Sequence, residues 1–170
     1  MSRLRKIAIL IEDYFDEREL IYPYYRFIEA GFEVDLIGPK KGLFHGKSGY
    51  SIKADKSIDE VRPEDYDAVY IPGGYAPDRL RRYDKILEFV KEMYRSGKLV
   101  GAICHGPWVL ISAGIVKGKK VTGFFAIRDD LINAGAHYTG EKVEVDGNLI
   151  TATDPTALAG MLKKMIELLK

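Results

Sequence analysis

The stretch KLVGAICHGPWVLISAG, residues 98–114, joins an apolar run to a proline- and glycine-containing segment at Cys104, the only cysteine of the chain. Residues 98–103 are almost entirely apolar, which is typical of a strand buried on both faces of a parallel sheet. The residues that follow Cys104, beginning HGPW, have the pattern of a helix that starts at once. This strand–turn–helix order is the repeating unit of α/β folds, and it predicts that Cys104 lies at the carboxyl end of a strand.

Apolar strands and amphipathic helices alternate in the same way over the rest of the chain. No linker or repeat interrupts them, so we expect one domain over residues 1–170. Alternating units of this kind predict the α/β class, with a mostly parallel central sheet and helices on both of its faces. Further strands are predicted at 6–11, 32–38 and 67–74, and helices at 16–30, 84–96 and 127–134. Residues 43–55 are predicted to form a small hairpin or an edge excursion, and residues 141–153 a hairpin.

Proline and glycine residues mark where the predicted helices begin and end. We expect the helix over 16–30 to be interrupted at Pro23 and closed by Gly31. Asp154 followed by Pro155 is a favoured start for the last helix. The apolar residues of that helix recur at helical spacing and are expected in the core: Leu158, Met161, Leu162, Met165, Ile166 and Leu169.

Three segments directly follow predicted parallel strands, namely 12–19, 72–78 and 104–107. Ligands of open parallel sheets bind outside the carboxyl ends of the strands. We therefore expect the functional site to lie where these three segments meet.

The charge and composition of the chain limit its partners. Twenty-six basic and 25 acidic residues leave a net charge of +1, which gives no electrostatic reason to expect a nucleic acid or an anionic membrane as partner. The apolar run 7–11 is too short for the core of a signal peptide, and no run approaches the roughly 18 apolar residues of a membrane span. A single cysteine allows no internal disulfide. We therefore expect a soluble, cytoplasmic protein.

His45 and His137 have no ligand-spaced partners and no phosphate-binding glycine motif is present, so neither a metal nor a cofactor is expected.

Cys104 has two interpretations. A lone cysteine after an apolar strand is often a small buried hydrophobe without reactivity. A residue at such a tight turn can also take a strained conformation that exposes its side chain, while the helix N-terminus behind it favours the thiolate. Gly106 allows a close approach of substrate or backbone, and Pro107 suits a first helical turn. The flanking His-Gly-Pro sequence and the position at a strand end favour the nucleophile.

Four stretches together resemble the ThiJ/PfpI family, a branch of the class I glutamine amidotransferase-like superfamily. The resemblance runs in order from about Lys6 to the end of the chain. It implies a flavodoxin-like three-layer sandwich and a homodimer, often assembled into hexamers. The activities that it implies are those of intracellular cysteine peptidases, of glyoxalases acting on methylglyoxal without a cofactor, and of deglycases, and some members act as chaperones or sensors of oxidative stress. The four stretches are AICHGPWVLISAG (102–114), YIPGGYAPD (70–78), DYFDERELIYPYYRFIEAGFEV (13–34) and DDLINAGA (129–136).

The resemblance also implies roles for individual residues. Cys104 matches the nucleophile of the family, and His105 matches the histidine that follows it. Glu19 matches the acidic residue whose carboxyl group contacts the cysteine sulfur. Because two neighbouring negative charges oppose each other, Glu19 is useful mainly when it is protonated and donates to the sulfur, or when it moves a proton. Apart from the resemblance, Glu19 would be interpreted as a solvated charge near a helix start.

The oxyanion site and a partner for His105 follow from the same resemblance. Gly73 and Gly74 match the glycine turn whose backbone N–H, together with that of His105, stabilises an oxyanion. Asp78 stands where peptidases of the family have a glutamate that reaches the histidine of a neighbouring subunit, and its side chain is one methylene shorter. Adjacent residues on a helix point about 100° apart, so adjacency alone does not place the ring of His105 against the sulfur of Cys104.

Aromatic residues depart from the family pattern at one place and accumulate at another. Phe124 and Phe125 stand where several relatives have a histidine or a tyrosine. They cannot transfer a proton, but they can form an apolar pocket wall with Tyr75 and Trp108 nearby. Trp108 is equally well explained as helix core.

The first predicted helix is rich in aromatic residues that fit the core or, better, a subunit interface: Tyr22, Tyr24, Tyr25 and Phe27.

These observations favour a cysteine-dependent hydrolase or lyase that attacks the carbonyl of an α-oxoaldehyde or of an early glycation adduct. Cys104 would be the nucleophile and Glu19 the proton donor and acceptor. One alternative is an intracellular peptidase with an intersubunit Cys104–His105–Asp78 site, which the shorter side chain of Asp78 disfavours. Others are a redox-sensing chaperone with an oxidisable Cys104, or a homologue in which Cys104 is merely packed. The expected substrates are a small aldehyde, a glycated amino acid or protein, or a peptide.

Overall fold

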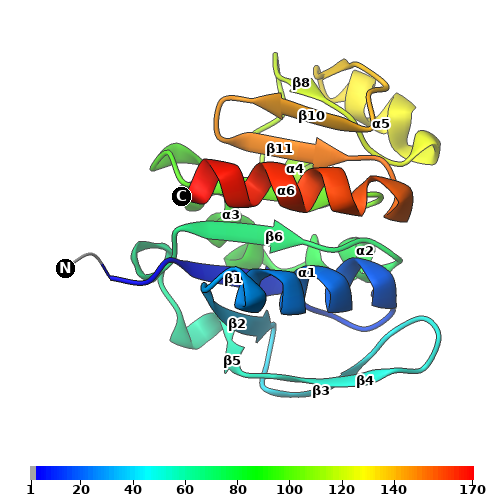
Figure 1. The fold of residues 1–170 in the computed structure, drawn as a ribbon. Helices are drawn as coiled ribbons and strands as arrows, with labels where there is room; N and C mark the ends of the chain where they lie inside the picture. The colour runs from blue at the N-terminus through cyan, green and yellow to red at the C-terminus, as the bar shows by residue number, and fades with distance from the viewer. Residues whose placement is uncertain (1–2) are drawn as a thin grey trace.

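The computed structural model describes residues 3–170 and has a central sheet of seven strands in the order β10-β11-β7-β6-β1-β2-β5. Neighbouring strands are parallel except at one edge, where β10 and β11 form an antiparallel hairpin. Helices cover both faces of the sheet (Figure 1). The predicted α/β architecture with a mostly parallel sheet is therefore confirmed. The strands of this sheet are β1 (Lys6–Leu10), β2 (Glu33–Gly38), β5 (Lys56–Ser57), β6 (Ala68–Ile71), β7 (Leu99–Ile103), β10 (Val143–Asp146) and β11 (Leu149–Ala152).

Each face of the sheet packs against its own set of helices. In Figure 1, α1 and α6 lie in front of the sheet, and α3 and α4 lie behind it. Side chains alternate along the buried strands, so Ile7 and Ile9 belong to the core under α1 and α6, whereas Ala8 and Leu10 belong to the core under α3 and α4. The helices are α1 (Glu17–Glu29), α2 (Ala76–Leu80), α3 (Asp84–Arg95), α4 (Pro107–Ser112), α5 (Arg128–Asn133) and α6 (Leu158–Leu169).

Two small two-stranded sheets and four 3₁₀ turns complete the part of the chain that the structure describes. The predicted hairpin over 43–55 is confirmed as the antiparallel pair β3 and β4, and the hairpin over 141–153 as β10 and β11. Within residues 3–170, no helix combines the length and the apolar character that a bilayer crossing requires. The smaller elements are β3 (Gly42–His45), β4 (Ser51–Ala54), β8 (Lys120–Val121), β9 (His137–Tyr138), η1 (Ile58–Glu60), η2 (Pro63–Asp65), η3 (Phe125–Ile127) and η4 (Pro155–Ala157).

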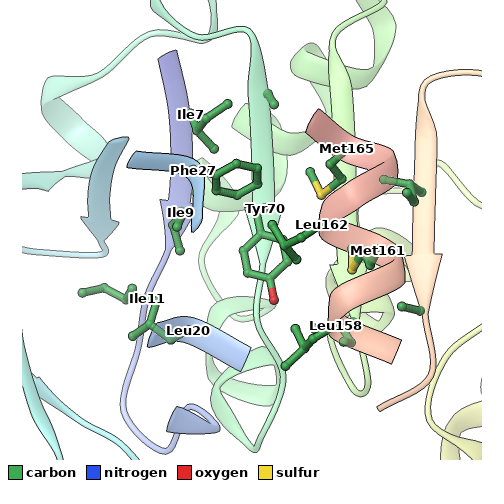
Figure 2. Close-up of a cluster of buried hydrophobic side chains, with 14 of the residues drawn as sticks. Ile7, Ile9, Ile11, Leu20, Phe27, Tyr70, Leu158, Met161, Leu162 and Met165 are labelled. Atoms are coloured by element: carbon green, nitrogen blue, oxygen red, sulfur yellow. The ribbon is translucent and has the colours of Figure 1, made fainter. Parts of the chain in front are cut away.

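The predicted apolar stripe of the last helix is confirmed, since all six of its residues are buried. Figure 2 shows Met161, Leu162 and Met165 of α6 beside Tyr70 of β6 and Phe27 of α1. The rings of Phe27 and Tyr70 meet edge to face, with centroids 6.2 Å apart. This layer fixes α1, the helix that carries Glu19, against the centre of the sheet.

The first helix differs from the prediction at Pro23. The expected interruption is wrong, because α1 runs from Glu17 to Glu29 without a break. A proline removes one N–H from the helix, and the buried Leu20 and Phe27 on either side of Pro23 hold the helix to the core. Gly31 follows the helix with a φ of +95°, as its predicted role in closing the helix requires.

Two other helix starts lie later than predicted. Asp154 caps the 3₁₀ turn η4, accepting a hydrogen bond from the N–H of Thr156 at 2.9 Å, and α6 begins only at Leu158. Likewise, α4 begins at Pro107 rather than directly after Cys104. The two intervening residues form a tight turn, and this turn shapes the site described next.

Candidate functional site

The segments that follow β1, β6 and β7 meet at the carboxyl edge of the sheet, as predicted. Phe15 and Gly74 form an isolated antiparallel bridge between the first two segments. The N–H of Asp16 also donates to the carbonyl of Gly73 at 3.1 Å. A Cβ added at Gly73 would lie against Oε1 of Glu19 and 2.7 Å from Cβ of Cys104. Only glycine leaves room there, and its small size brings Glu19 and Cys104 together.

Cys104 occupies a left-handed backbone conformation with φ +62°. Its carbonyl accepts the N–H of Phe124 at 2.8 Å, and its N–H donates to the carbonyl of Ala152 at 3.0 Å, so both backbone groups are fixed. A Cβ on Gly106 would lie 2.8 Å from the carbonyl oxygens of Ile71 and Ile103, which explains the glycine in this turn. The strained turn that the sequence predicts at the end of the strand is therefore present.

The sulfur of Cys104 is less exposed and less acidic than expected. The residue is only 8% exposed, and burial, followed by the negative charge of Glu19, raises the pKa of its thiol to about 12. The backbone N–H groups of Gly74 and His105 act on the sulfur in the direction that favours the thiolate, but they do not outweigh the burial. Desolvation therefore outweighs the backbone groups that the sequence analysis expected to favour the thiolate.

Glu19 lies in the first turn of α1 and is fully buried. Its Oε1 accepts the N–H of Gly73 at 2.8 Å, and its Oε2 has no hydrogen-bond partner among residues 3–170. Burial, followed by the nearby charge of Asp16, raises the pKa of Glu19 to about 7. A carboxyl group with this pKa can accept or donate a proton at neutral pH, as its predicted role requires.

The ring of His105 faces the sulfur after all. Its Nδ1 lies 3.3 Å from Sγ of Cys104, because the left-handed turn rotates two adjacent side chains toward each other. Burial lowers the pKa of His105, and the charge of Lys47 lowers it further, so the imidazole is neutral at neutral pH. The ring is stacked on Phe124 with centroids 5.0 Å apart and meets Trp108 edge-on at 5.0 Å.

The predicted aromatic wall is thus present for three of its four residues. Tyr75 completes the group around His105, with ring centroids 6.2 Å apart. Phe125 is 71% exposed and stacks under the guanidinium of Arg128 instead. Trp108 is half-buried at the edge of the site, where its Nε1 donates to Asp130 at 2.9 Å, and it is therefore not plain helix core.

Three charged residues beside Glu19 were not singled out from the sequence. Asp16 is buried and caps α1, and it also pairs with Arg18 at 2.7 Å and with Lys47 at 2.8 Å. Burial by itself raises the pKa of Asp16, but the hydrogen bonds from Arg18 and Lys47 lower it to about 2. The charge cluster DERE, residues 16–19, begins with Asp16 and was the available signal for the cap, but Lys47 joins it from the distant β3–β4 hairpin.

Asp78 lies on the short helix α2, where its carboxylate accepts a hydrogen bond from Arg82 at 2.6 Å. It lines a surface cavity of about 420 Å³ together with Arg81, Trp108 and Asp130. Within one chain, this arrangement gives Asp78 a partner other than His105. Whether it reaches the His105 of a neighbouring subunit stays a prediction.

The aromatic residues of α1 divide between core and surface. Phe27 is buried, whereas Tyr22 and Tyr25 are exposed and line a groove of about 610 Å³ that extends to Leu158 at the start of α6.

No group of three histidine, cysteine or acidic side chains among residues 3–170 is arranged to hold a metal ion.

Comparisons with known proteins find relatives over nearly the whole chain. The model of the DJ-1/PfpI family matches residues 5–168. Deglycase PfpI of Pyrococcus furiosus is 46% identical over 165 residues, which cover 97% of this chain and 99% of that protein. The protein/nucleic acid deglycase 2 of Escherichia coli is 42% identical over 168 residues, covering 97% of this chain and 98% of that protein.

A solved structure extends the similarity to three dimensions. It is a two-domain protein from Anabaena variabilis that contains DJ-1/ThiJ/PfpI-like and ferritin-like domains. The two structures superpose with a TM-score of 0.95 at 44% identity, over 97% of this chain and 48% of that one. The chain belongs to the DJ-1/PfpI family.

Proposed function

We propose that this protein is a cysteine-dependent deglycase that also acts on free α-oxoaldehydes. The observation that carries the proposal is the meeting of Glu19 and Cys104 across Gly73, beside the N–H groups of Gly74 and His105. Relatives named deglycases match nearly the whole chain, and the protein is an enzyme of their family. Glycation adducts and α-oxoaldehydes share an electrophilic carbon bonded to oxygen, which a thiolate can attack.

The first step joins sulfur to carbon. As Sγ of Cys104 attacks a carbonyl carbon, the thiol proton passes to the carboxylate of Glu19, whose pKa of about 7 suits transfer at neutral pH. The thiol therefore does not need to be ionised at rest, and a thiol pKa of about 12 is compatible with catalysis. Burial keeps bulk water away from both groups and makes the transfer between them direct.

The oxyanion forms beside two backbone donors. The N–H of Gly73 is engaged by Glu19, so the N–H groups of Gly74 and His105 are the donors left for the oxyanion. Protonated Glu19 then returns its proton to the oxygen or to a departing amine. With methylglyoxal, a hemithioacetal forms, a proton moves from its first to its second carbon to give a thioester, and water hydrolyses the thioester to lactate.

Three substrate classes should be compared in one experiment: methylglyoxal, methylglyoxal-treated N-acetyl amino acids and fluorogenic peptides. Methylglyoxal-treated guanosine is added to these three as a fourth substrate, because the name of the Escherichia coli relative includes nucleic acids. We expect turnover of the first two classes by the wild type and none by Cys104→Ala. Turnover retained by Cys104→Ala would exclude the covalent mechanism, and cleavage of peptides alone would favour the peptidase.

The peptidase alternative makes a separate demand on Asp78. It requires Asp78 to leave Arg82 and reach His105 of another subunit, whereas the deglycase mechanism does not use Asp78. Peptide cleavage that disappears in Asp78→Ala while methylglyoxal turnover persists would establish both activities in one site. For the redox alternative, the expected sign is oxygen addition at Cys104 by mass spectrometry after mild peroxide treatment.

Assembly and location remain predictions. The exposed Tyr22 and Tyr25 and the groove beside Leu158 support a homodimer or hexamer that uses this face of α1. Light scattering of the wild type and of a Tyr22→Glu/Tyr25→Glu variant tests this. A cytoplasmic location follows only from the expectations drawn from the sequence.

A further inference from the structure

The hydrogen-bond ladder of α1 has a gap at Glu19. In an α-helix, the carbonyl of residue i accepts the N–H of residue i+4. The residue four positions after Glu19 is Pro23, which has no N–H to donate. Glu19 is fully buried, so its carbonyl has no access to solvent, and an unpaired buried carbonyl is costly. The sequence thus creates an acceptor that a group outside the helix must satisfy.

Tyr70 of β6 supplies that group. Its hydroxyl donates to the carbonyl oxygen of Glu19 at 2.6 Å, and the whole side chain is buried. In Figure 2 the hydroxyl points away from Phe27, in the direction in which β1 runs from Ile7 to Ile11. This is the direction of the carboxyl ends of the parallel strands. Burial, followed by the charge of Glu19, raises the pKa of Tyr70 well above its usual value, so the hydroxyl keeps its proton.

The same segment also holds the side chain of Glu19. Gly73, three residues after Tyr70, donates its N–H to Oε1 of Glu19 at 2.8 Å. Glu19 is therefore held at its backbone by Tyr70 and at its carboxyl group by Gly73. Its second oxygen, Oε2, has no partner within residues 3–170 and is the one left for proton transfer.

We propose that Tyr70 is a positioning residue for Glu19: its hydroxyl replaces the helix donor that Pro23 removes and fixes the carboxyl group beside Cys104. The inference rests on the proposed function of Glu19. Without the hydroxyl, the Glu19 carbonyl has to find water, and α1 shifts at this turn. The carboxyl group then becomes better hydrated, and its pKa falls toward its ordinary value. The charged and titratable groups that face Glu19, namely Asp16, Arg18, Lys47 and Cys104, are not altered by this change.

Tyr70→Phe tests the proposal, since it keeps the buried ring and removes only the hydroxyl. The first readout is the rate at which iodoacetamide alkylates Cys104 between pH 5 and 9, which needs no substrate turnover. In the wild type we expect this rate to rise with a midpoint near 7, as the pair of Glu19 and Cys104 loses its first proton. In Tyr70→Phe the midpoint should fall by roughly half a pH unit or more, and kcat/KM for methylglyoxal should fall roughly tenfold or more.

Pro23→Ala provides a rescue. Alanine at position 23 has an N–H that can donate to the Glu19 carbonyl, so the hydroxyl of Tyr70 becomes dispensable. We expect Pro23→Ala/Tyr70→Phe to show the midpoint of Pro23→Ala alone. Comparing these two variants also tests the proposal if Tyr70→Phe alone fails to fold. An alkylation midpoint that is lower in the double variant than in Pro23→Ala contradicts the proposal.

Tyr66→Phe is the matched control. Tyr66 is a second buried tyrosine, whose hydroxyl donates to Asp35 at 2.7 Å, and it packs in the core on the opposite face of the sheet. We expect it to lose stability without moving the alkylation midpoint. An equal shift in Tyr66→Phe, or a wild-type midpoint in Tyr70→Phe, overturns the proposal. A wild type that shows the alkylation midpoint but no turnover of methylglyoxal or glycated substrates overturns the proposed function and leaves the positioning role standing.

Discussion

Nδ1 of His105 lies 3.3 Å from Sγ of Cys104, although the two residues are neighbours in the chain. The contact exists because Cys104 has a φ of +62°, which turns its side chain back toward the one that follows. His105 thus contributes two groups to the site, its ring and its backbone N–H. A substitution of His105 can remove its ring and keep its backbone N–H.

His105→Ala should lower kcat/KM for methylglyoxal less than Glu19→Gln does. The ring of His105 is neutral and orients the sulfur, so we expect a loss of roughly tenfold. Glu19→Gln removes the proton acceptor itself, and we expect a loss of roughly 100-fold or more. Steady-state kinetics of the two variants at pH 7.5 compare them directly. A larger loss in His105→Ala would identify the histidine as the proton acceptor.

The raised pKa of Glu19 predicts a dependence of stability on pH. The folded pKa of about 7 lies above the ordinary value, so the folded state binds this proton more tightly than the unfolded state does. The stabilisation is complete below about pH 4.5 and is lost as the pH rises through 7. Glu19→Gln removes this loss and should raise the free energy of unfolding at pH 8 by about 1–3 kcal/mol. Urea denaturation at pH 5 and pH 8 measures the free energy of unfolding of both proteins. A Glu19→Gln variant that is less stable than the wild type at pH 8 contradicts the prediction.

Asp16 predicts the opposite slope. Hydrogen bonds from Arg18 and Lys47 outweigh the effect of burial and hold its pKa at about 2, so its contribution is present above about pH 4 and lost as the pH falls through 2. Asp16→Asn keeps a capping oxygen but removes the charge, and should cost about 1–2 kcal/mol at pH 6. It should also lower the pKa of Glu19, since the charge of Asp16 raises it. Denaturation and the pH profile of Cys104 alkylation check the two parts separately.

Two glycines provide a matched test of packing. Gly106→Ala places a Cβ 2.8 Å from two backbone carbonyl oxygens, which cannot yield, and should cost about 3 kcal/mol or more. Gly160→Ala lies in α6, where the new Cβ would meet only Cγ2 of Val143 at 3.6 Å, and should stabilise the fold by about 0.5–1 kcal/mol. Thermal unfolding of both variants and the wild type measures these changes in stability. A tolerated Gly106→Ala would show that the turn after β7 is less crowded than its backbone contacts imply.

The sequence predicts the main elements of the fold because their signals are local. Apolar runs define the strands, the stripe from Leu158 to Leu169 defines the face of α6, and the residues around Cys104 define the strained turn. The order of these elements also predicts that segments carrying Glu19, Gly73 and Cys104 meet at one edge of the sheet. Local signals failed at Pro23, where the packing of α1 against the sheet and the hydroxyl of Tyr70 offset the loss of one helix hydrogen bond.

What only the tertiary structure decides is the chemical state of the site. Lys47 reaches Asp16 from another hairpin, Tyr70 reaches the Glu19 carbonyl from the sheet, and Phe124 stacks on His105 from a later loop. The pKa values of Cys104 and Glu19 depend on how completely such long-range neighbours exclude water. Desolvation is a property of all the atoms around a group, and residues adjacent in the chain supply only a few of them. The sequence therefore determines which segments meet in this protein, and the packed core decides which group of the site holds the proton.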